Sequence, residues 1–264
     1  MIYKSFYFYS AETFKSMCAS KNNVFPEETK RIYLPYNAFT DSDITRLVAN
    51  MPCEKVAVLP YVNKGNARID FANKFDAVCE TADGFLIENI GDLPFLDGIL
   101  TANGAPGGEA AGHKSDKFLC GDYSLNTFNA ESAAFWAASG LKSVTVSPEP
   151  EAAEQIRLAN AVCKLPVSTM LPEIIVGGKV IVMRSEHCFI TDNPKYHCGK
   201  CGKNGTAGYT LTDNAGNEFP LIGLPLDCQN LVLSAKNIEI DEEYVKKHIS
   251  ADCILRYNIL NDYR

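Results

Sequence analysis

Three features are missing from this 264-residue sequence: long apolar runs, an excess of basic charge and a secretion signal. No segment approaches the roughly 18 apolar residues that a membrane-spanning helix needs. The N-terminus lacks the basic start, leucine-rich core and small-residue cleavage site of a signal peptide. The net charge of −7 argues against a protein that coats nucleic acid, although it leaves room for a local basic groove. We therefore expect a globular cytoplasmic protein without membrane contact.

The sequence also lacks the motifs of the common hydrolases. It contains no G-x-S-x-G nucleophile turn, no H-E-x-x-H zinc helix and no Cys/His protease signature. Only four histidines are present; His113 lies in the Gly/Ala-rich stretch 102–116, and His248 lies on a polar predicted helix. The stretch 102–116 lacks the G-K-[ST] of a phosphate-binding loop, so we predict a mobile loop there. Direct proteolysis therefore has little support from the sequence.

Cysteine, by contrast, is abundant, and four of the ten cysteines cluster in the C-terminal part of the chain. Cys198 and Cys201 form a C-x-x-C pair in a Gly/Lys/Asn loop, with Cys188 before it and Cys228 after it. Such a pair aims two thiolates at one point, and two thiolates from flanking segments would complete a tetrahedral site. Structural zinc and cubane iron–sulfur clusters both use four thiolates. We predict that the four sulfurs converge on one metal centre, within about 4–7 Å of each other.

Two alternatives to this four-cysteine site stay open. Cys198 and Cys201 could form a redox disulfide, although such a pair normally opens a helix after a strand. His187 or His197 could replace a thiolate, although each is better explained as a surface residue or a neighbour of the ligands. The remaining cysteines are dispersed singly among apolar residues, as buried thiols are, which indicates a reducing compartment. They are Cys18, Cys53, Cys79, Cys120, Cys163 and Cys253.

Short apolar runs rich in β-branched and aromatic residues alternate with amphipathic stretches along the chain. Strands that alternate with helices are parallel, and eight strands in about 250 residues match a (β/α)8 barrel better than an open sheet. No segment after Ile259 is long enough for an eighth helix. The predicted α/β fold is therefore a TIM-like barrel that is complete or lacks its last helix. We expect its strands at Lys4–Tyr9, Arg31–Leu34, Lys55–Leu59, Gly84–Glu88, Lys117–Cys120, Lys142–Val146, Glu173–Val176 and Cys253–Ile259.

Three stretches between these strands carry helix signals. The first has apolar residues at helical spacing over 44–51, behind a candidate N-cap at Asp41. The second is an apolar stripe over 125–136. The third covers 152–163 and follows a candidate cap at Ser147.

An insertion interrupts the barrel between the seventh and eighth strands and contains the four clustered cysteines. It includes the pattern of a β-hairpin that turns at Asn214–Gly216. An insertion after a barrel strand emerges at the carboxyl ends of the strands, where active sites of this architecture lie. We divide the chain into barrel strands one to seven (1–183), a metal-binding insertion (184–240) and the last helix and strand (241–264).

Several runs in the second half of the chain resemble the collagenase-like peptidase family U32. The resemblance is clear over residues 117–240 and loose over 30–100, and it corresponds to the barrel portion of longer family members. It therefore implies a partner protein or a flanking domain outside this chain. The runs are Gly121–Asn129 (G-D-x-x-L-N-x-x-N), Val146–Glu149, Glu173–Lys179, Met183–Cys188, Asp213–Leu221, Asp227-Cys228 and Leu233–Lys236.

The resemblance implies an activity other than the one in the family's name. Members of the family are implicated in oxygen-independent hydroxylation of ubiquinone precursors and of RNA bases, and they bind a four-iron (4Fe–4S) cluster through four cysteines. The corresponding ligands here would be Cys188, Cys198, Cys201 and Cys228, with a tighter C-x-x-C spacing than in some relatives. We expect a 4Fe–4S cluster, replaced by zinc or by an empty site after aerobic purification. The expected substrate is a small planar molecule or an RNA base.

Polar residues near the predicted strand ends are the candidates for the chemistry. Asp122 and Asn126 follow the fifth strand, Glu149 follows the sixth, and Arg184 closely precedes the cysteines. A carboxylate at a barrel mouth could act as a general base, and Arg184 could hold an anionic group with two hydrogen bonds. Structural roles compete with these: Asp122 or Asn126 could cap the following helix, and Glu149 could complement a helix dipole.

Three functions are compatible with these features. The favoured one is iron–sulfur-dependent oxidation or hydroxylation of a planar substrate, on which Tyr36, Tyr61 or Tyr123 could stack. Glu173 is a further polar candidate in that site. The second function is the peptidase activity of the family's name, and the third is a binding or assembly module in which zinc only stabilises the insertion.

Overall fold

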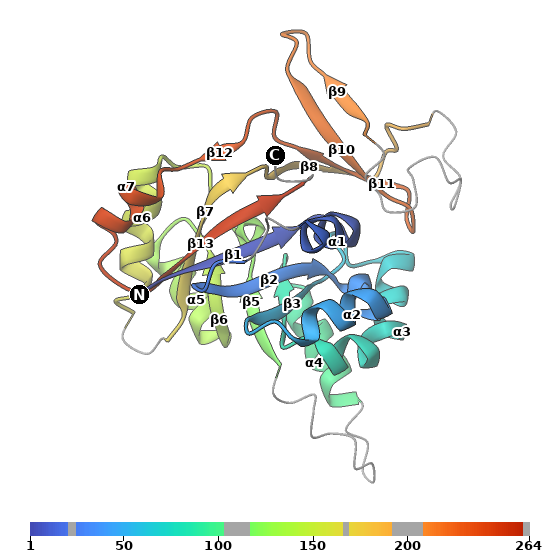
Figure 1. Cartoon of the computed structure of the whole chain (residues 1–264), viewed down its shortest axis with the longest axis horizontal. Coiled ribbons are helices and arrows are strands. Elements are labelled where there is room, and N and C mark those ends of the chain that lie inside the picture. The colour runs from blue at the N-terminus through green and yellow to red at the C-terminus, as the bar shows by residue number, and fades with distance from the viewer. Residues whose placement is uncertain (21–24, 103–116, 166–168, 192–207, 261–264) are drawn as a thin grey trace.

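The computed structural model describes residues 1–20, 25–102, 117–165, 169–191 and 208–260, without the side chains of 99–102. Eight parallel strands close into a barrel, so the predicted α/β barrel fold is confirmed (Figure 1). Strands β1 to β7 follow one another around the barrel, and the last strand, β13, pairs in parallel with both β7 and β1. The barrel strands are β1 Ile2–Phe8, β2 Thr29–Pro35, β3 Glu54–Val58, β4 Gly84–Ile87, β5 Phe118–Gly121, β6 Leu141–Thr145, β7 Leu171–Gly178 and β13 Cys253–Ile259.

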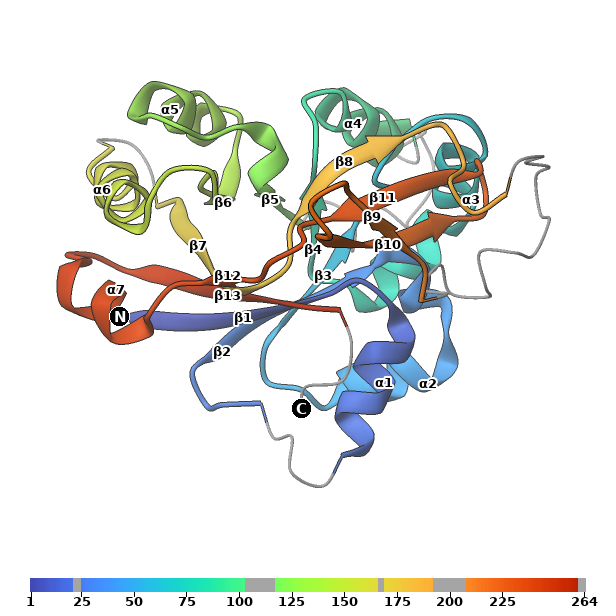
Figure 2. The same ribbon diagram turned by 90° about the horizontal axis from the view of Figure 1, so that it is seen from above.

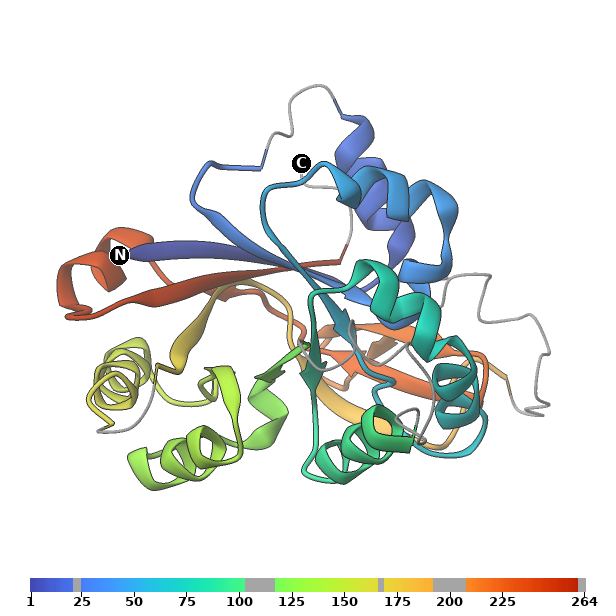
Figure 3. The same cartoon turned by 90° about the horizontal axis from the view of Figure 1, so that it is seen from below.

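Helices connect the barrel strands, with one α-helix between each successive pair. In Figure 3, which shows the barrel from below, the helices lie outside the ring of strands. Among the described residues no helix follows β13, and none has the length and apolar composition to cross a membrane. The helices are α1 Ala11–Ala19, α2 Ser42–Ala49, α3 Gly65–Thr81, α4 Asp92–Ala102, α5 Ala130–Ala138, α6 Ala152–Val162 and α7 Glu242–His248. The loop predicted over 102–116 lies outside the described residues, apart from the last residue of α4.

The helix starts show which local signals are reliable. Asp41 caps α2 as expected, and its carboxylate accepts hydrogen bonds from two backbone N–H groups of the first turn. The helix expected over 125–136 begins only after Asn129, which caps α5, because a 3-10 turn occupies the residues after β5. The cap expected at Ser147 is also wrong. Pro150 disfavours a helical conformation at the residue before it, and α6 starts beyond this proline.

Side chains alternate between the two faces of the barrel strands. Outward-facing apolar residues, among them Phe8, Ile32 and Phe85, belong to the main hydrophobic core beneath the helices. The inward positions differ from the Val/Ile/Leu filling common in such barrels, because many of them are polar or charged. These buried inward residues include Ser5, Arg31, Tyr33, Asp122, Ser143, Thr145, Glu173, Arg256 and Asn258. Each such group needs a hydrogen-bonding partner, either within the protein or on a ligand.

A four-stranded antiparallel sheet is inserted between β7 and β13, and we call it the cap sheet. Its strand order is β8-β11-β10-β9. The predicted hairpin is confirmed, since Thr212 pairs with Glu218 on either side of a turn in which Gly216 has a φ of +83°. Past the cap sheet, β12 (Ile238–Glu239) pairs antiparallel with β7. The strands of the cap sheet are β8 Ile181–Ser185, β9 Thr210–Thr212, β10 Glu218–Leu224 and β11 Gln229–Leu233.

The cap sheet covers the carboxyl end of the barrel. Ile222 and Leu231 of this sheet belong to one hydrophobic cluster with Tyr7, Tyr33 and other inward residues of the barrel. Figure 2, seen from above, shows the cap sheet in front of β3 and β4. The insertion therefore lies at the end of the barrel where the sequence predicts it.

Candidate active site at the barrel mouth

Three of the four predicted catalytic residues line one pocket at the carboxyl end of the barrel. Asn126, Glu149 and Arg184 line a pocket of about 380 Å³ between the ends of β5 and β6 and strand β8, and we call it the Arg184 pocket. Asn126 ends the 3-10 turn after β5 with a left-handed backbone (φ +53°), and Glu149 is exposed in the loop after β6. Three separate segments thus bring an amide, a carboxylate and a guanidinium to one space.

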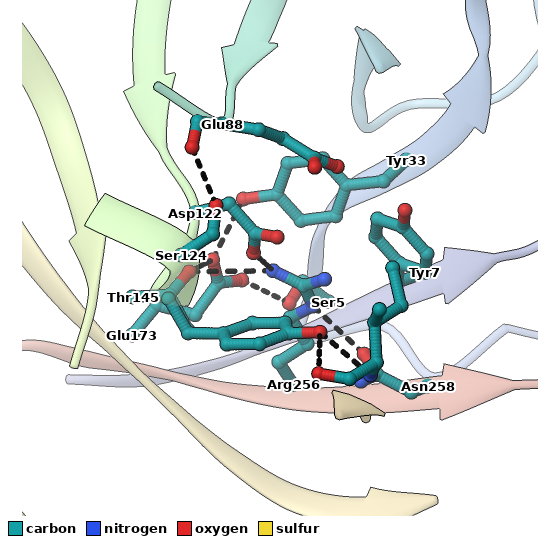
Figure 4. Close-up of polar contacts among 12 residues, drawn as sticks. Ser5, Tyr7, Tyr33, Glu88, Asp122, Ser124, Thr145, Glu173, Arg256 and Asn258 are labelled. Atoms are coloured by element: carbon teal, nitrogen blue, oxygen red, sulfur yellow. Dashed lines mark hydrogen bonds and ion pairs between the residues drawn. The ribbon is translucent and has the colours of Figure 1, made fainter. Parts of the chain in front are cut away.

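The fourth predicted residue, Asp122, forms a buried ion pair at the same end of the barrel. Its Oδ1 accepts a hydrogen bond from Nη1 of Arg256 at 2.6 Å, and both side chains are almost fully buried. Asp122 makes no capping hydrogen bond to the turn that follows it, so the capping alternative is wrong for this residue. Arg256 comes from β13 and also donates to Thr145 at 3.3 Å and to Asn258 at 2.8 Å (Figure 4).

The surroundings of Arg256 keep its guanidinium charged. Burial alone would lower the pKa of Arg256, but the carboxylates of Asp122 and Glu173 raise it above its ordinary value. The guanidinium carbon also lies 4.2 Å from the ring centroid of Tyr7. Nη2 of Arg256 and Oδ2 of Asp122 have no hydrogen-bond partner among the described residues. The pair therefore retains one donor and one acceptor for a further polar group.

Glu88 is a second buried carboxylate at the mouth. It directly follows β4, and its Oε2 forms an ion pair with Arg184, whose Nη1 also donates to the backbone carbonyl of Tyr61 at 3.1 Å. Burial raises the pKa of Glu88 to about 8, an effect that Arg184 opposes and the charge of Asp122 reinforces. Oε1 of Glu88 has no hydrogen-bond partner within the described part of the chain. Because Arg184 is 26% exposed and Glu88 is not exposed at all, Arg184 connects the pocket to a buried acid.

A deeper layer of polar side chains crosses the barrel below this pair. Glu173 accepts hydrogen bonds from the hydroxyls of Ser5, Tyr33 (2.8 Å) and Thr145 (3.0 Å) (Figure 4). Arg31 donates to the hydroxyl of Tyr33 at 3.0 Å; it also donates to Ser143 at 2.6 Å and pairs with Glu54 at 2.6 Å. Glu173 is therefore surrounded by donors from three other strands.

Sequence reasoning missed several of these residues, above all Glu88, Arg31 and Arg256. A weak signal existed, because each is a charged residue within or beside an apolar run that was correctly predicted as a strand. A charge in such a run must be exposed or paired. Strand alternation alone does not say whether the polar face is solvated or points into a barrel, so the signal could not be used.

The structure describes two of the four predicted metal ligands, and it brings them to one end of a strand pair. Cys188 is buried just beyond β8, and Cys228 immediately precedes β11. In the antiparallel β8–β11 pair Ser185 lies opposite Asn230, whose side-chain oxygen also accepts a hydrogen bond from the backbone N–H of Phe189 at 2.6 Å. Cys228 also has a left-handed backbone (φ +53°), which is uncommon for a residue other than glycine.

The rest of the predicted metal site lies outside the described residues. Cys198, Cys201 and His197 belong to the undescribed segment 192–207. Within the described ranges, no group of three or more His, Cys, Asp or Glu side chains could hold a metal ion. His187 is exposed, with its ring edge-to-face against Phe189. Cys188 and Cys228, both free cysteines, are the two predicted ligands that the structure describes, and the four-thiolate site stays a prediction.

The three tyrosines proposed to stack on a substrate are buried at the mouth, and their hydroxyls are already used. Tyr36 donates to Asp70 at 2.7 Å, and Tyr61 accepts a hydrogen bond from Tyr7 at 2.8 Å. Tyr123 accepts a hydrogen bond from the backbone N–H of the first residue of β8 at 2.7 Å, which holds the start of the cap sheet on the barrel. Each of these hydroxyls therefore already has a hydrogen-bond partner within the protein.

No family model and no curated protein matches this chain. Among solved structures it is similar to a U32 peptidase, at 13% identity and a TM-score of 0.43, over 66% of this chain and 69% of that one. It is also similar to a candidate deoxyribose-phosphate aldolase from Coccidioides immitis, at 13% identity and a TM-score of 0.42, over 65% and 70% of the two chains. The C-terminal domain of a candidate chitinase from Desulfitobacterium hafniense gives 9% identity and a TM-score of 0.39, over 96% and 93%. Similarities as distant as these carry no argument about what the chain does.

Proposed function

We propose that this protein is an iron–sulfur-dependent oxidoreductase that oxidises or hydroxylates a planar substrate, an RNA base or a quinone precursor, at the mouth of its barrel. One observation carries the proposal. Strand β8 brings Arg184 into the mouth, and its pairing with β11 also brings Cys188 and Cys228 to one end of that strand pair. Two of the predicted metal ligands and Arg184 of the polar pocket therefore lie on or beside one small, hydrogen-bonded strand pair.

The cysteines would hold the cofactor, and the resemblance to family U32 supports a 4Fe–4S cluster on Cys188, Cys198, Cys201 and Cys228. When bound, such a cluster supplies one-electron transfer. Hydroxylation without molecular oxygen replaces a C–H hydrogen by a hydroxyl group from water and releases two electrons and two protons. The reaction therefore needs an electron acceptor, such as a quinone or a redox protein, and a group that accepts protons.

The chain's own residues suit the binding and proton-transfer parts of this reaction. Arg184 can hold an anionic or carbonyl group of the substrate in its pocket. The ionised form of Glu88 can accept a proton as a stronger base than an ordinary carboxylate, because its pKa is raised to about 8. The ion pair of Asp122 with Arg256 fixes two further hydrogen-bonding atoms at the same end of the barrel. Asn126 and Glu149 add polar groups to the lining of the Arg184 pocket.

Metal analysis after anaerobic purification tests the proposal. We expect a brown protein with about four irons and four sulfides per chain. Cys228→Ser should lower the iron content, whereas Cys18→Ser, a cysteine on α1 outside the cap sheet, should not. A colourless protein with one zinc would instead support the stabilised binding module.

Activity in cells provides the second part of the test. Cys198→Ser and Asp122→Asn should each abolish the modification of RNA nucleosides or quinones, measured by mass spectrometry in cells that lack the native protein. If the purified chain cleaves gelatin and Cys198→Ser does not slow the cleavage, the chain is a peptidase and the proposal is wrong.

A further inference from the structure

A second pocket lies at the mouth, on the side of the barrel opposite the Arg184 pocket. It has a volume of about 170 Å³ and opens between the ends of β1, β2 and β3 and the β10–β11 turn of the cap sheet. The residues that line it include Tyr9, Tyr36, Tyr61, Ile222 and Leu224. We call it the Tyr61 pocket.

The size of the Tyr61 pocket fits one ring. An apolar protein cavity of about 150 Å³ is known to bind benzene, so a pocket of about 170 Å³ has room for a single six-membered ring with a small substituent. The tyrosine hydroxyls are engaged elsewhere: Tyr9 donates to the backbone carbonyl of Lys179 at 2.8 Å, and Tyr36 and Tyr61 have the partners given above. The tyrosines therefore offer ring faces and edges, which favour an aromatic ligand over an aliphatic one.

The charges around the Tyr61 pocket favour a neutral ligand. No Lys or Arg is among the residues that line it, and its carboxylate is that of Asp227. Both oxygens of Asp227 already accept hydrogen bonds at 2.9 Å, from the backbone N–H groups of Asn66 and Ala67 in the first turn of α3. An anion would find no counter-ion here, whereas the amides of Asn37 and Gln229 can hydrogen-bond a neutral polar substituent.

The Tyr61 pocket also adjoins one of the predicted metal ligands. Cys228 stands between Asp227 and Gln229, and both of those neighbours line the pocket. We infer that the Tyr61 pocket binds a neutral single-ring aromatic or heteroaromatic group that carries a hydrogen-bonding substituent. The assignment of the Tyr61 pocket to the ring of the substrate rests on the proposed function. Binding of such a group to the pocket can be tested independently of that function.

The test uses three matched probes on the full chain: benzamide, benzoate and cyclohexanecarboxamide. Each probe is a six-membered ring with one carboxamide or carboxylate substituent, and the three differ in charge or in aromaticity. Ligand-observed NMR titration should give millimolar binding of benzamide, with benzoate and cyclohexanecarboxamide at least about tenfold weaker.

Two substitutions of Ala67 locate the site. Ala67 is half-buried and lines the pocket from the first turn of α3, so Ala67→Phe and the smaller Ala67→Leu should fill the pocket and weaken benzamide at least about tenfold. The matched control is Ala72→Phe, an exposed position of the same helix outside the pocket lining, which should leave binding unchanged. Circular dichroism verifies that each variant is folded.

The outcomes separate this inference from the proposed function. Absence of benzamide binding, binding that survives both Ala67 variants, or equal binding of benzoate or the cyclohexane probe would each overturn the inference. None of these results depends on a metal. If benzamide binds as expected but Cys228→Ser changes neither iron content nor activity in cells, the proposed function fails and the binding site stands.

Discussion

Two layers of polar and charged side chains fill the barrel, and they differ in how completely their hydrogen-bonding atoms are used. In the inner layer, none of the buried side-chain nitrogens and oxygens lacks a partner. In the mouth layer, Glu88, Asp122 and Arg256 each keep one buried atom without a partner among the described residues. The inner layer consists of Ser5, Arg31, Tyr33, Ser143 and Glu173, and the mouth layer of Glu88, Asp122, Arg184 and Arg256.

This difference distinguishes polar groups that support a fold from those that await a ligand. A satisfied buried network gives the barrel one defined arrangement, and it leaves nothing to offer a substrate. An incomplete one lowers stability, because each unpartnered buried group costs about 1–3 kcal/mol. Such groups are expected where chemistry takes place. The comparison therefore assigns stability to the inner layer and activity to the mouth layer.

The largest effect is expected from removing the charge of Asp122. Asp122→Asn leaves the Arg256 guanidinium buried without its counter-ion, which should lower the free energy of unfolding by about 3–5 kcal/mol. The double variant Asp122→Leu/Arg256→Met should recover most of this stability, because a buried ion pair contributes little net free energy compared with apolar residues. Urea denaturation followed by circular dichroism measures both effects.

The double variant also tests the comparison between the layers. It should be stable and yet inactive in cells that lack the native protein. Full activity in the stable double variant would show that the Asp122–Arg256 pair only supports the fold, contrary to its assignment to the mouth layer.

Glu88→Gln should separate activity from stability. Glutamine resembles the protonated form of Glu88, so near pH 4.5, where the folded chain keeps Glu88 protonated and the unfolded chain is only half ionised, we expect the free energy of unfolding to change by less than about 1 kcal/mol. Activity should fall about 100-fold to 10,000-fold, because the amide cannot accept the proton. The control is Glu131→Gln, an exposed position of α5, which should leave both quantities unchanged. A fully active Glu88→Gln enzyme would remove Glu88 from the proposed reaction.

A substitution in the inner layer should lower stability and leave activity nearly unchanged, the reverse of what we expect for Glu88→Gln. Glu173→Gln replaces one of two acceptor oxygens by a donor that faces donating hydroxyls, so we expect a loss of about 1–3 kcal/mol of unfolding free energy. Activity per folded molecule should stay within about twofold, since Glu173 lies outside the lining of both pockets. Activity lost without any loss of stability would erase the distinction between the layers.

A pH dependence that comes from Glu88 tests the same comparison. Its pKa is about 8 in the folded chain against an ordinary value of 4.5, so the native state binds a proton that the unfolded chain releases between these values. Its contribution to stability is therefore fully present below pH 4.5 and is lost as the pH rises towards 8. The difference in unfolding free energy between the native chain and Glu88→Gln, measured from pH 5 to 8, should shift steadily in favour of the variant. A constant difference would contradict the raised pKa.

The architecture was largely predictable because each barrel strand is a local pattern. A run such as Cys253–Ile259 is identified by its own residues, and its crossover neighbours define the parallel order. The start of α5 could not be predicted, since the apolar stripe continues at helical spacing through the 3-10 turn that precedes Asn129.

The site was predictable only in part, for a related reason. Asp122, Asn126 and Glu149 could be chosen because strand ends are recognisable in the sequence, and Arg184 because it closely precedes the cysteines. The partner of Asp122, Arg256, could not be predicted, because it is 134 positions away and only the closed barrel makes the two residues neighbours.

Barrel closure by β13 also has a consequence for the order in which the protein can form during synthesis. β1 is the first strand to leave the ribosome, yet one of its two neighbours is the last barrel strand to appear. Until then β1 and β7 each expose an unpaired edge that can join another chain. Arg256 arrives with that same strand, so the nascent chain completes its cap sheet before its mouth layer can assemble.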